Sequence, residues 1–225
     1  MGTLMDWNTH LLFAHVLLFV FWLGTDIGVF VLGKFAQNPK YSVDQRLLLL
    51  QPTLIIDMFP RICMVLIVPT GYQLAVNLEA IHASQYFTMG VWLLSGVWLA
   101  VVLTRFFWSE QPVGQNARRV EKIIHYFVVL TAGWAGLASI YYGAPIHEYW
   151  IAEKVVVYVL IVLCVWLLEM AFDPAAIAFM RLEKEGSTAE LEMQISGGMN
   201  RTYAWVIAIY ILVAHSAWLG VSHPG

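Results

Sequence analysis

Long apolar runs separated by short polar segments make up almost the whole sequence. Each run is long enough to cross the hydrocarbon core of a bilayer as a helix, which takes about 20 residues. The runs lack the alternation of apolar and polar residues over about 10 positions that is typical of membrane β-barrel strands. The pattern predicts an all-α polytopic transmembrane bundle of six spans, forming one domain over residues 1–225. The spans are expected at Thr9–Lys34, Leu47–Leu78, Thr88–Trp108, Val120–Tyr142, Trp150–Phe172 and Arg201–Val221.

The second apolar run is too long for one straight span, and it contains Pro52, Pro60 and Pro69. Proline inside a helix removes a backbone hydrogen bond and crowds the preceding turn. We therefore expect this span to be tilted, kinked or partly outside the membrane.

The segment Asp173–Asn200 is the sizeable polar stretch of the chain. It is predicted to be a cytoplasmic loop. Its charge-mixed part, Arg181–Glu192, is expected to form a short solvated helix. Gly197 and Gly198 are expected to end that helix, because glycine is a weak helix former.

Composition supports a membrane location. Hydrophobic residues make up 60% of the chain and charged residues only 12%, whereas a soluble domain carries about 25% charged residues. Disorder is excluded by the apolar content, and two cysteines are too few for a disulfide scaffold. No phosphate-binding glycine loop, nucleotide fingerprint or hydrolase elbow is present. We expect the lipid bilayer, and no nucleic acid, to be a partner.

Basic residues lie in alternate connections between the spans. Since cytoplasmic loops are enriched in Lys and Arg, both termini are predicted to face the periplasm, in a bacterial inner membrane. The segment Met1–Asn8 contains no basic residue, so the first span is expected to be retained rather than cleaved as a signal. The basic residues that set this orientation are Lys34, Lys40, Arg46, Arg105, Arg118, Arg119, Lys122, Arg181, Lys184 and Arg201.

Nitrogen-bearing side chains of three spans fall at one depth in the outer half of the membrane. His15 and His215 each lie about 9 Å from the outer end of their span, at 1.5 Å per residue. Lys154 lies about one turn inside the fifth span, and His10 lies nearer the interface. A lone membrane histidine usually bonds a neighbouring helix, and Lys154 can also reach back to the interface. Two histidines at matched depth favour a ligand site.

Neutral imidazoles on facing helices, within apolar and aromatic surroundings, suit the axial coordination of a haem iron. We therefore expect His15 and His215 to be axial ligands of a noncovalent haem b, since the chain has no C-x-x-C-H motif. Trp22 would pack on the porphyrin, and Lys154 would neutralise a propionate or occupy an axial position. Copper is the alternative metal, because Met58, Cys63 and Met64 lie on the second span.

A second polar layer is predicted in the central and inner part of the membrane. Asp57 and Arg61 are spaced four residues apart, acid first, as in a favourable intrahelical ion pair. Asp26 follows His15 by three helical turns and shares its face, so Asp26 and Asp57 are candidates for proton handling. Arg61 is a candidate substrate or propionate partner. His125 is expected near the cytoplasmic interface, as a hydrogen-bonding residue or as the ligand of a second haem.

Three motifs resemble the HemJ-type membrane proteins and the related copper-resistance D (CopD) type. They are His15 followed by Trp22–Leu23–Gly24, Trp150 followed by Lys154, and Arg61 followed by Pro69–Thr70–Gly71. The HemJ type binds haem b and oxidises protoporphyrinogen IX, and the CopD type is associated with copper uptake. The resemblance implies that His15 and Lys154 contact a haem or a substrate.

The sequence thus predicts a membrane haem b protein that acts in electron transfer or oxidoreduction. Its substrate is expected to resemble a porphyrinogen or a quinone, and protoporphyrinogen oxidation is the specific enzymatic reading. A copper or other metal permease is one alternative. An accessory subunit of a respiratory complex is another, with either homo-oligomers or respiratory subunits as partners.

Overall fold

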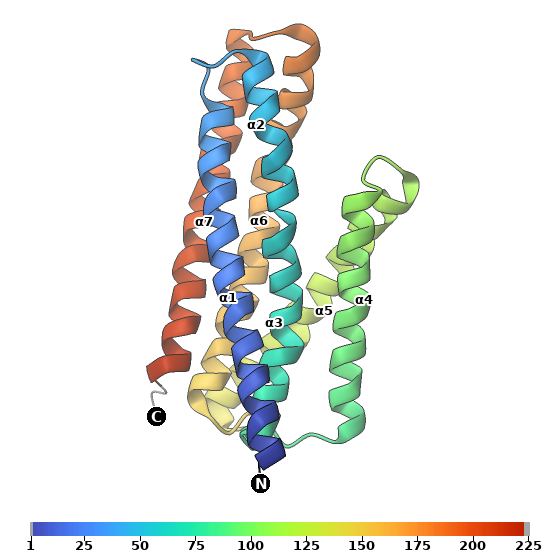
Figure 1. Cartoon of the computed structure of the whole chain (residues 1–225), viewed down its shortest axis with the longest axis vertical. Coiled ribbons are helices and arrows are strands. Elements are labelled where there is room, and N and C mark those ends of the chain that lie inside the picture. Colours follow the sequence, from blue (N-terminus) through green and yellow to red (C-terminus); the bar gives the residue numbers. More distant parts are fainter. Residues whose placement is uncertain (1, 223–225) are drawn as a thin grey trace.

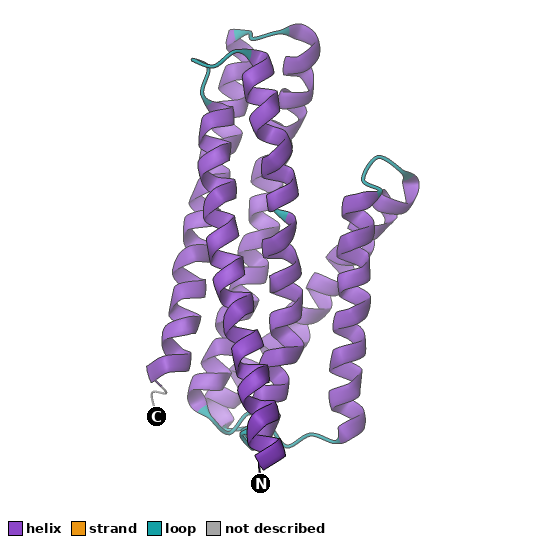
Figure 2. Cartoon of the chain, viewed as in Figure 1, coloured by secondary structure: helices purple, strands orange, loops and turns teal. Residues whose placement is uncertain are grey.

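A computed structural model describes residues 2–222 of the chain, and nearly all of them are helical (Figure 2). The helices are α1 (Gly2–Gln37), α2 (Val43–Ile56), α3 (Met58–Asn77), α4 (Gln85–Phe107), α5 (Pro112–Tyr142), α6 (Tyr149–Glu185) and α7 (Ala189–Ser222). Within these described residues there is no strand, only an isolated bridge between Ile81 and Ile146. Six helical segments are long and apolar enough to cross a membrane, with α2 and α3 together forming one of them. The predicted all-α fold and the number of spans are confirmed.

The bundle has two distinct ends (Figure 1). Helix α1 begins and α7 finishes at the same end, which we term the terminus end; residues 78–84 and 143–148 also connect helices there. We term the opposite end the basic end, because its connections, residues 38–42, 108–111 and 186–188, are flanked by most of the basic residues. His223 lies outside the described residues.

Helices α1, α3, α6 and α7 form the main body of the bundle. Helix α6 packs along α7 and α5, while α1 packs along α2, α3 and α7. Helix α4 packs mainly along its neighbours α3 and α5, and it stands apart from the main body toward the basic end (Figure 1). Trp22, Cys63 and Met64 lie in the largest buried apolar cluster, at the centre of the molecule.

The break between α2 and α3 is explained by Pro60. Proline has no backbone N–H, so the carbonyl four residues earlier, that of Ile56, loses its helical donor. Helix α2 ends at Ile56 and α3 begins at Met58. Pro60 then lies in the first turn of α3, where the missing N–H costs nothing. The expected kink is present, and Asp57 occupies it.

The segment Asp173–Asn200 differs from its prediction as a loop. Helix α6 continues to Glu185 and α7 begins at Ala189, so the connection is only residues 186–188. Gly198 does not end a helix. A Cβ at Gly198 would lie 2.8 Å from the Cβ of Ala175, so this glycine lets α7 approach α6 closely. Close packing of α7 against α6 explains why glycine occupies position 198, where the sequence pattern predicts the end of a helix.

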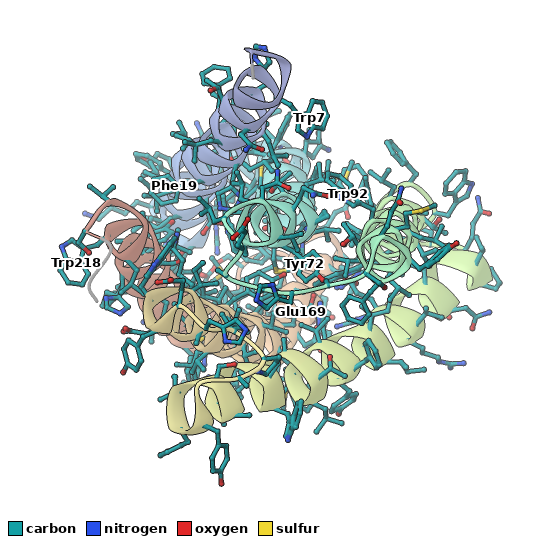
Figure 3. All side chains as sticks on the ribbon, turned by 90° about the horizontal axis from the view of Figure 1, so that it is seen from below. Trp7, Phe19, Tyr72, Trp92, Glu169 and Trp218 are labelled. Atoms are coloured by element: carbon teal, nitrogen blue, oxygen red, sulfur yellow. The ribbon has the colours of Figure 1, made fainter. Side chains whose placement is uncertain are left out.

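The outer faces of the bundle are rich in exposed apolar side chains, as lipid contact requires. Phe13, Leu130 and Ile211 are all more than 60% exposed. Viewed along the bundle, Trp7 and Trp218 project outward, whereas Glu169 lies in the interior (Figure 3). The chain is therefore a multi-pass membrane protein that carries charged groups inside its helical bundle.

Candidate functional site

His15 of α1 is held in place by Thr70 of α3. The His15 Nδ1 lies 2.9 Å from Thr70 Oγ1, and the Thr70 hydroxyl itself donates to the carbonyl of Leu66 at 2.9 Å. Because the Thr70 hydroxyl donates its proton to the backbone carbonyl, its oxygen is left to accept a hydrogen bond from the N–H at His15 Nδ1. The histidine is therefore the tautomer with a free electron pair on Nε2.

His15 is also held sterically by Gly71. A Cβ at Gly71 would lie 2.9 Å from His15 Cε1, closer than real Cβ contacts allow. Only glycine at this position lets the imidazole lie directly against α3. The Pro69–Thr70–Gly71 segment stays helical. It therefore provides a surface on which the His15 ring packs, and it does not interrupt the helix.

Glu153 and Lys154 of α6 both contact α7 near the terminus end. The Glu153 Oε1 lies 2.8 Å from His215 Nε2. The Lys154 ammonium lies 5.3 Å from the centre of the Trp150 ring and so close to Gly220 that a Cβ there would be 2.5 Å from Nζ. Lys154 is also within electrostatic reach of His15. We call His15, Thr70, Glu153, Lys154 and His215 the outer site.

The outer site contains residues of α1, α3, α6 and α7. His15 faces α3, while His215 bonds α6 and stacks on Trp218 with ring centres 5.9 Å apart. His10 is exposed on α1, nearer the terminus end. Trp22 is 5% exposed and belongs to the central apolar cluster.

A network of ion pairs crosses the bundle on the basic side of the centre. Arg61 Nε lies 2.7 Å from Asp57 Oδ2, which confirms the intrahelical pair. Glu169 Oε1 of α6 accepts from both Arg61 Nη1 at 3.0 Å and Arg105 Nη1 at 2.8 Å. Arg105 of α4 also pairs with Glu121 of α5. We call Asp57, Arg61, Arg105, Glu121 and Glu169 the inner network.

The inner network joins three carboxylates to two guanidinium groups, so its formal charge is negative. Glu121 is 2% exposed and Glu169 is 8% exposed, which makes these charges costly unless they are paired. Asp26 of α1 lies within electrostatic reach of Asp57 and Arg61 and beside the hydroxyl of Tyr210. Asp26 therefore extends the network toward α1 and α7.

His125 of α5 lies next to the inner network. It is 8% exposed, it contacts the edge of Trp98 with ring centres 5.5 Å apart, and its Nε2 has no hydrogen-bond partner among the described residues. The position is interior to the bundle rather than on its polar surface. A buried ring nitrogen without a partner costs about 1–3 kcal/mol, which marks His125 as a candidate functional group.

Sequence reasoning missed several members of both sites. From the sequence pattern, Arg105 reads as a basic residue of a connection and Glu169 as a solvated residue at the inner end of its span, while Glu121 and Glu153 do not stand out. The missing signal is the contact partner: each of these residues pairs with a charge or an imidazole on another helix. Acid and base at similar depths on different spans are the pattern that would have found them.

The two sites offer different chemistry. The outer site presents an imidazole electron pair beside an ammonium group in apolar surroundings, which suits a metal ion with an anionic ligand. The inner network offers carboxylates and a histidine that can exchange protons, while the two arginines neutralise most of the negative charge of the carboxylates.

The chain was compared with protein-family models, curated proteins and solved structures, and no match was found in any of them. The resemblance to the HemJ and CopD types therefore stays a prediction from the motifs.

Proposed function

We propose that this chain is a membrane haem b protein that acts in electron transfer or oxidoreduction. The observation that carries the proposal is the 2.9 Å hydrogen bond between His15 Nδ1 and Thr70 Oγ1, from which the tautomer of His15 is inferred. Its Nδ1 proton is donated to Thr70, so Nε2 has a free electron pair directed away from that bond. Histidines that ligate metals are commonly oriented in this way by a hydrogen bond at the other ring nitrogen.

The residues of the outer site fit a haem to different degrees. His15 fits an axial position, because its ring is oriented by Thr70 and seated on Gly71. His215 uses Nε2 for its bond to Glu153, so it would ligate through Nδ1 or after that bond opens. Lys154 supplies a cation within electrostatic reach of His15, as a propionate requires. His15 is therefore assigned as the principal ligand, with His215 as the second.

A bound haem b would supply a one-electron redox centre whose potential depends on the axial ligands and on burial. Around it, the chain's own residues would orient the ligand and handle charge. Thr70 fixes the His15 ring, and Lys154 balances negative charge. Asp26 and Asp57 would exchange protons with the basic end, and Arg61 positions Asp57 through their 2.7 Å contact.

The orientation of the protein follows from the basic end. Since Lys and Arg are enriched in cytoplasmic connections, we place the basic end in the cytoplasm and the outer site near the periplasm of a bacterial inner membrane. In this orientation the inner network lies between the cytoplasm and the outer site. Protons taken up during reduction would then come from the cytoplasmic side.

An absorption spectrum of the purified protein, oxidised and then reduced with dithionite, tests the proposal. A sharp reduced α band and a pyridine haemochrome of the b type would support it. A colourless protein expressed with ample haem would contradict it. Metal-dependent uptake by such a colourless protein would favour the copper permease of the CopD type.

A further inference from the structure

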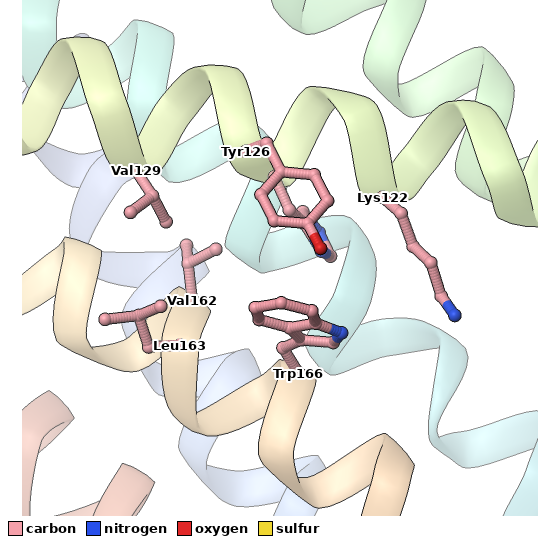
Figure 4. A pocket seen from close by; sticks show the side chains of 7 residues that line it. Lys122, Tyr126, Val129, Val162, Leu163 and Trp166 are labelled. Atoms are coloured by element: carbon pink, nitrogen blue, oxygen red, sulfur yellow. The ribbon is translucent and has the colours of Figure 1, made fainter.

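A cavity opens between α5 and α6 on the side of the inner network (Figure 4). Its volume is about 140 Å³. The side chains that line it are Lys122, His125, Tyr126, Val129, Val162, Leu163 and Trp166. Tyr126 is 49% exposed, so one wall of the cavity faces the lipid side of the bundle. A ligand could enter from the membrane without passing through the protein.

The cavity has the dimensions of a single six-membered ring. An engineered apolar cavity of about 150 Å³ is known to hold benzene. The ring of Tyr126 stands against that of Trp166, with centres 5.0 Å apart and planes at 79°, and the two rings bound the space on one side. A flat aromatic group would therefore meet aromatic and aliphatic walls of matching size.

Polar and apolar groups are separated along this cavity. Val129, Val162 and Leu163 form an apolar end, while the Tyr126 hydroxyl and the Trp166 indole nitrogen point toward the end where Lys122 lies (Figure 4). The polar groups at that end are hydrogen-bond donors. They suit a ring that carries carbonyl oxygens and an aliphatic tail.

His125 adds a buried polar group to the wall. It is 8% exposed, and its Nε2 has no partner among residues 2–222. It also lies within electrostatic reach of Glu121 and Glu169, so the cavity adjoins the inner network. The Nε2 atom is itself covered in the structure, so a ligand carbonyl would become its partner once the side chains at this wall shift.

We propose that this cavity between α5 and α6 binds the ring of a membrane quinone, with His125 and Tyr126 donating to its carbonyl oxygens and the tail leaving toward lipid. The inference deepens the proposed function, on which it rests for its biological role, because it names the substrate class. The head group of an anionic phospholipid is the competing occupant, since Lys122 is a cation at the rim.

The test measures the binding of decylubiquinone to the full chain in phosphatidylcholine nanodiscs, by quenching of tryptophan fluorescence. Val129→Phe fills the cavity and is expected to weaken quinone binding at least about tenfold. His125→Leu removes a hydrogen-bond donor and is expected to weaken quinone binding by about the same factor, which corresponds to the loss of one buried hydrogen bond. Leu130→Phe is the matched control, because Leu130 is the next residue and is 71% exposed. It is expected to bind as the unmodified chain does.

Equal affinity of all four proteins would overturn the proposal, as would displacement of the quinone by phosphatidylglycerol at equal mole fraction. The measurement does not depend on haem. Specific quinone binding by a protein without a haem band would support the cavity and contradict the proposed function. A haem band without specific quinone binding would support the proposed function and contradict quinone binding in the cavity.

Discussion

Glu169 of α6 binds Arg61 of α3 across the interior of the bundle, with 3.0 Å between Glu169 Oε1 and Arg61 Nη1. The same oxygen lies 2.8 Å from Arg105 Nη1 of α4. One carboxylate therefore joins three helices, among them α4, which otherwise packs mainly against α3 and α5. The inner network is what ties α4 to the main body of the bundle at this depth.

Glu169→Ala is expected to destabilise the protein by about 1–3 kcal/mol, because it removes the charged acceptor shared by Arg61 and Arg105, although Arg61 keeps Asp57 and Arg105 keeps Glu121. Glu169→Gln keeps an acceptor of the same size and is expected to lose less. Thermal unfolding in detergent measures both. Glu185→Ala on the same helix is the control, since its pair with Arg181 is exposed and worth at most about 1 kcal/mol. Equal melting temperatures for the two alanine variants would contradict a structural role for the network.

Arg46 is expected to be the most sensitive residue of the basic end. It is 0% exposed, its Nε donates to the Ala36 carbonyl at 2.8 Å, and its Nη1 lies 2.6 Å from Glu192 Oε1. Arg46→Ala should cost about 2–3 kcal/mol, because the Ala36 carbonyl loses its donor and Glu192 is left with the Ser187 hydroxyl in place of a cation. The exposed Arg201→Ala should change stability by less than about 0.5 kcal/mol. Thermal unfolding in detergent again provides the measurement.

The double variant Arg46→Met with Glu192→Met separates charge pairing from packing at that site. Replacing a buried ion pair by apolar residues is often neutral. The double variant is therefore expected to be more stable than Arg46→Ala. If it were equally unstable, the loss in Arg46→Ala would come from packing volume and not from the unpaired Glu192.

Gly71→Ala is expected to displace the His15 ring, since the new Cβ would lie 2.9 Å from Cε1. The hydrogen bond to Thr70 should weaken and the haem absorption bands should shift. Gly90→Ala on α4 is the matched control, because no atom lies within 4 Å of the added Cβ. That change should instead stabilise its helix by up to about 1 kcal/mol. Identical spectra for Gly71→Ala and the unmodified protein would argue against His15 as a ligand.

The predicted orientation is tested by cysteine labelling in intact cells, in a variant without Cys63 and Cys164. Tyr142→Cys places a thiol at the terminus end, where Tyr142 is 86% exposed. Ser109→Cys places one in a connection of the basic end. A membrane-impermeant maleimide should label only the first thiol until the inner membrane is permeabilised. The opposite labelling order would reverse the assigned orientation.

Helices were predictable from the sequence because their signal is local. An apolar run of sufficient length defines a span by itself, and Pro60 explains the break at Asp57 from its own chemistry. Gly198 shows where local reasoning fails. Its effect depends on Ala175, a residue of another helix that packs against it, and no local pattern contains that partner.

The sites were predictable in depth but not in pairing. Counting residues predicts one depth for His15, Lys154 and His215. In the structure Lys154 lies within electrostatic reach of His15, and the neighbouring Glu153 bonds His215. The rotation of each helix decides which partner a side chain meets. His215 meets Glu153, and Arg61 meets Glu169, because α6 turns those carboxylates inward. That rotation is set by packing between helices, which the sequence pattern does not specify.

The reduced spectrum of His15→Ala is the most direct test of the proposed haem site. The unmodified protein should show a b-type α band, and His15→Ala should lose or shift it. His82→Ala, in the connection between α3 and α4, should leave the band unchanged. An unaltered α band in His15→Ala, or the absence of any band in the unmodified protein expressed with ample haem, would contradict the assignment of His15 as an iron ligand.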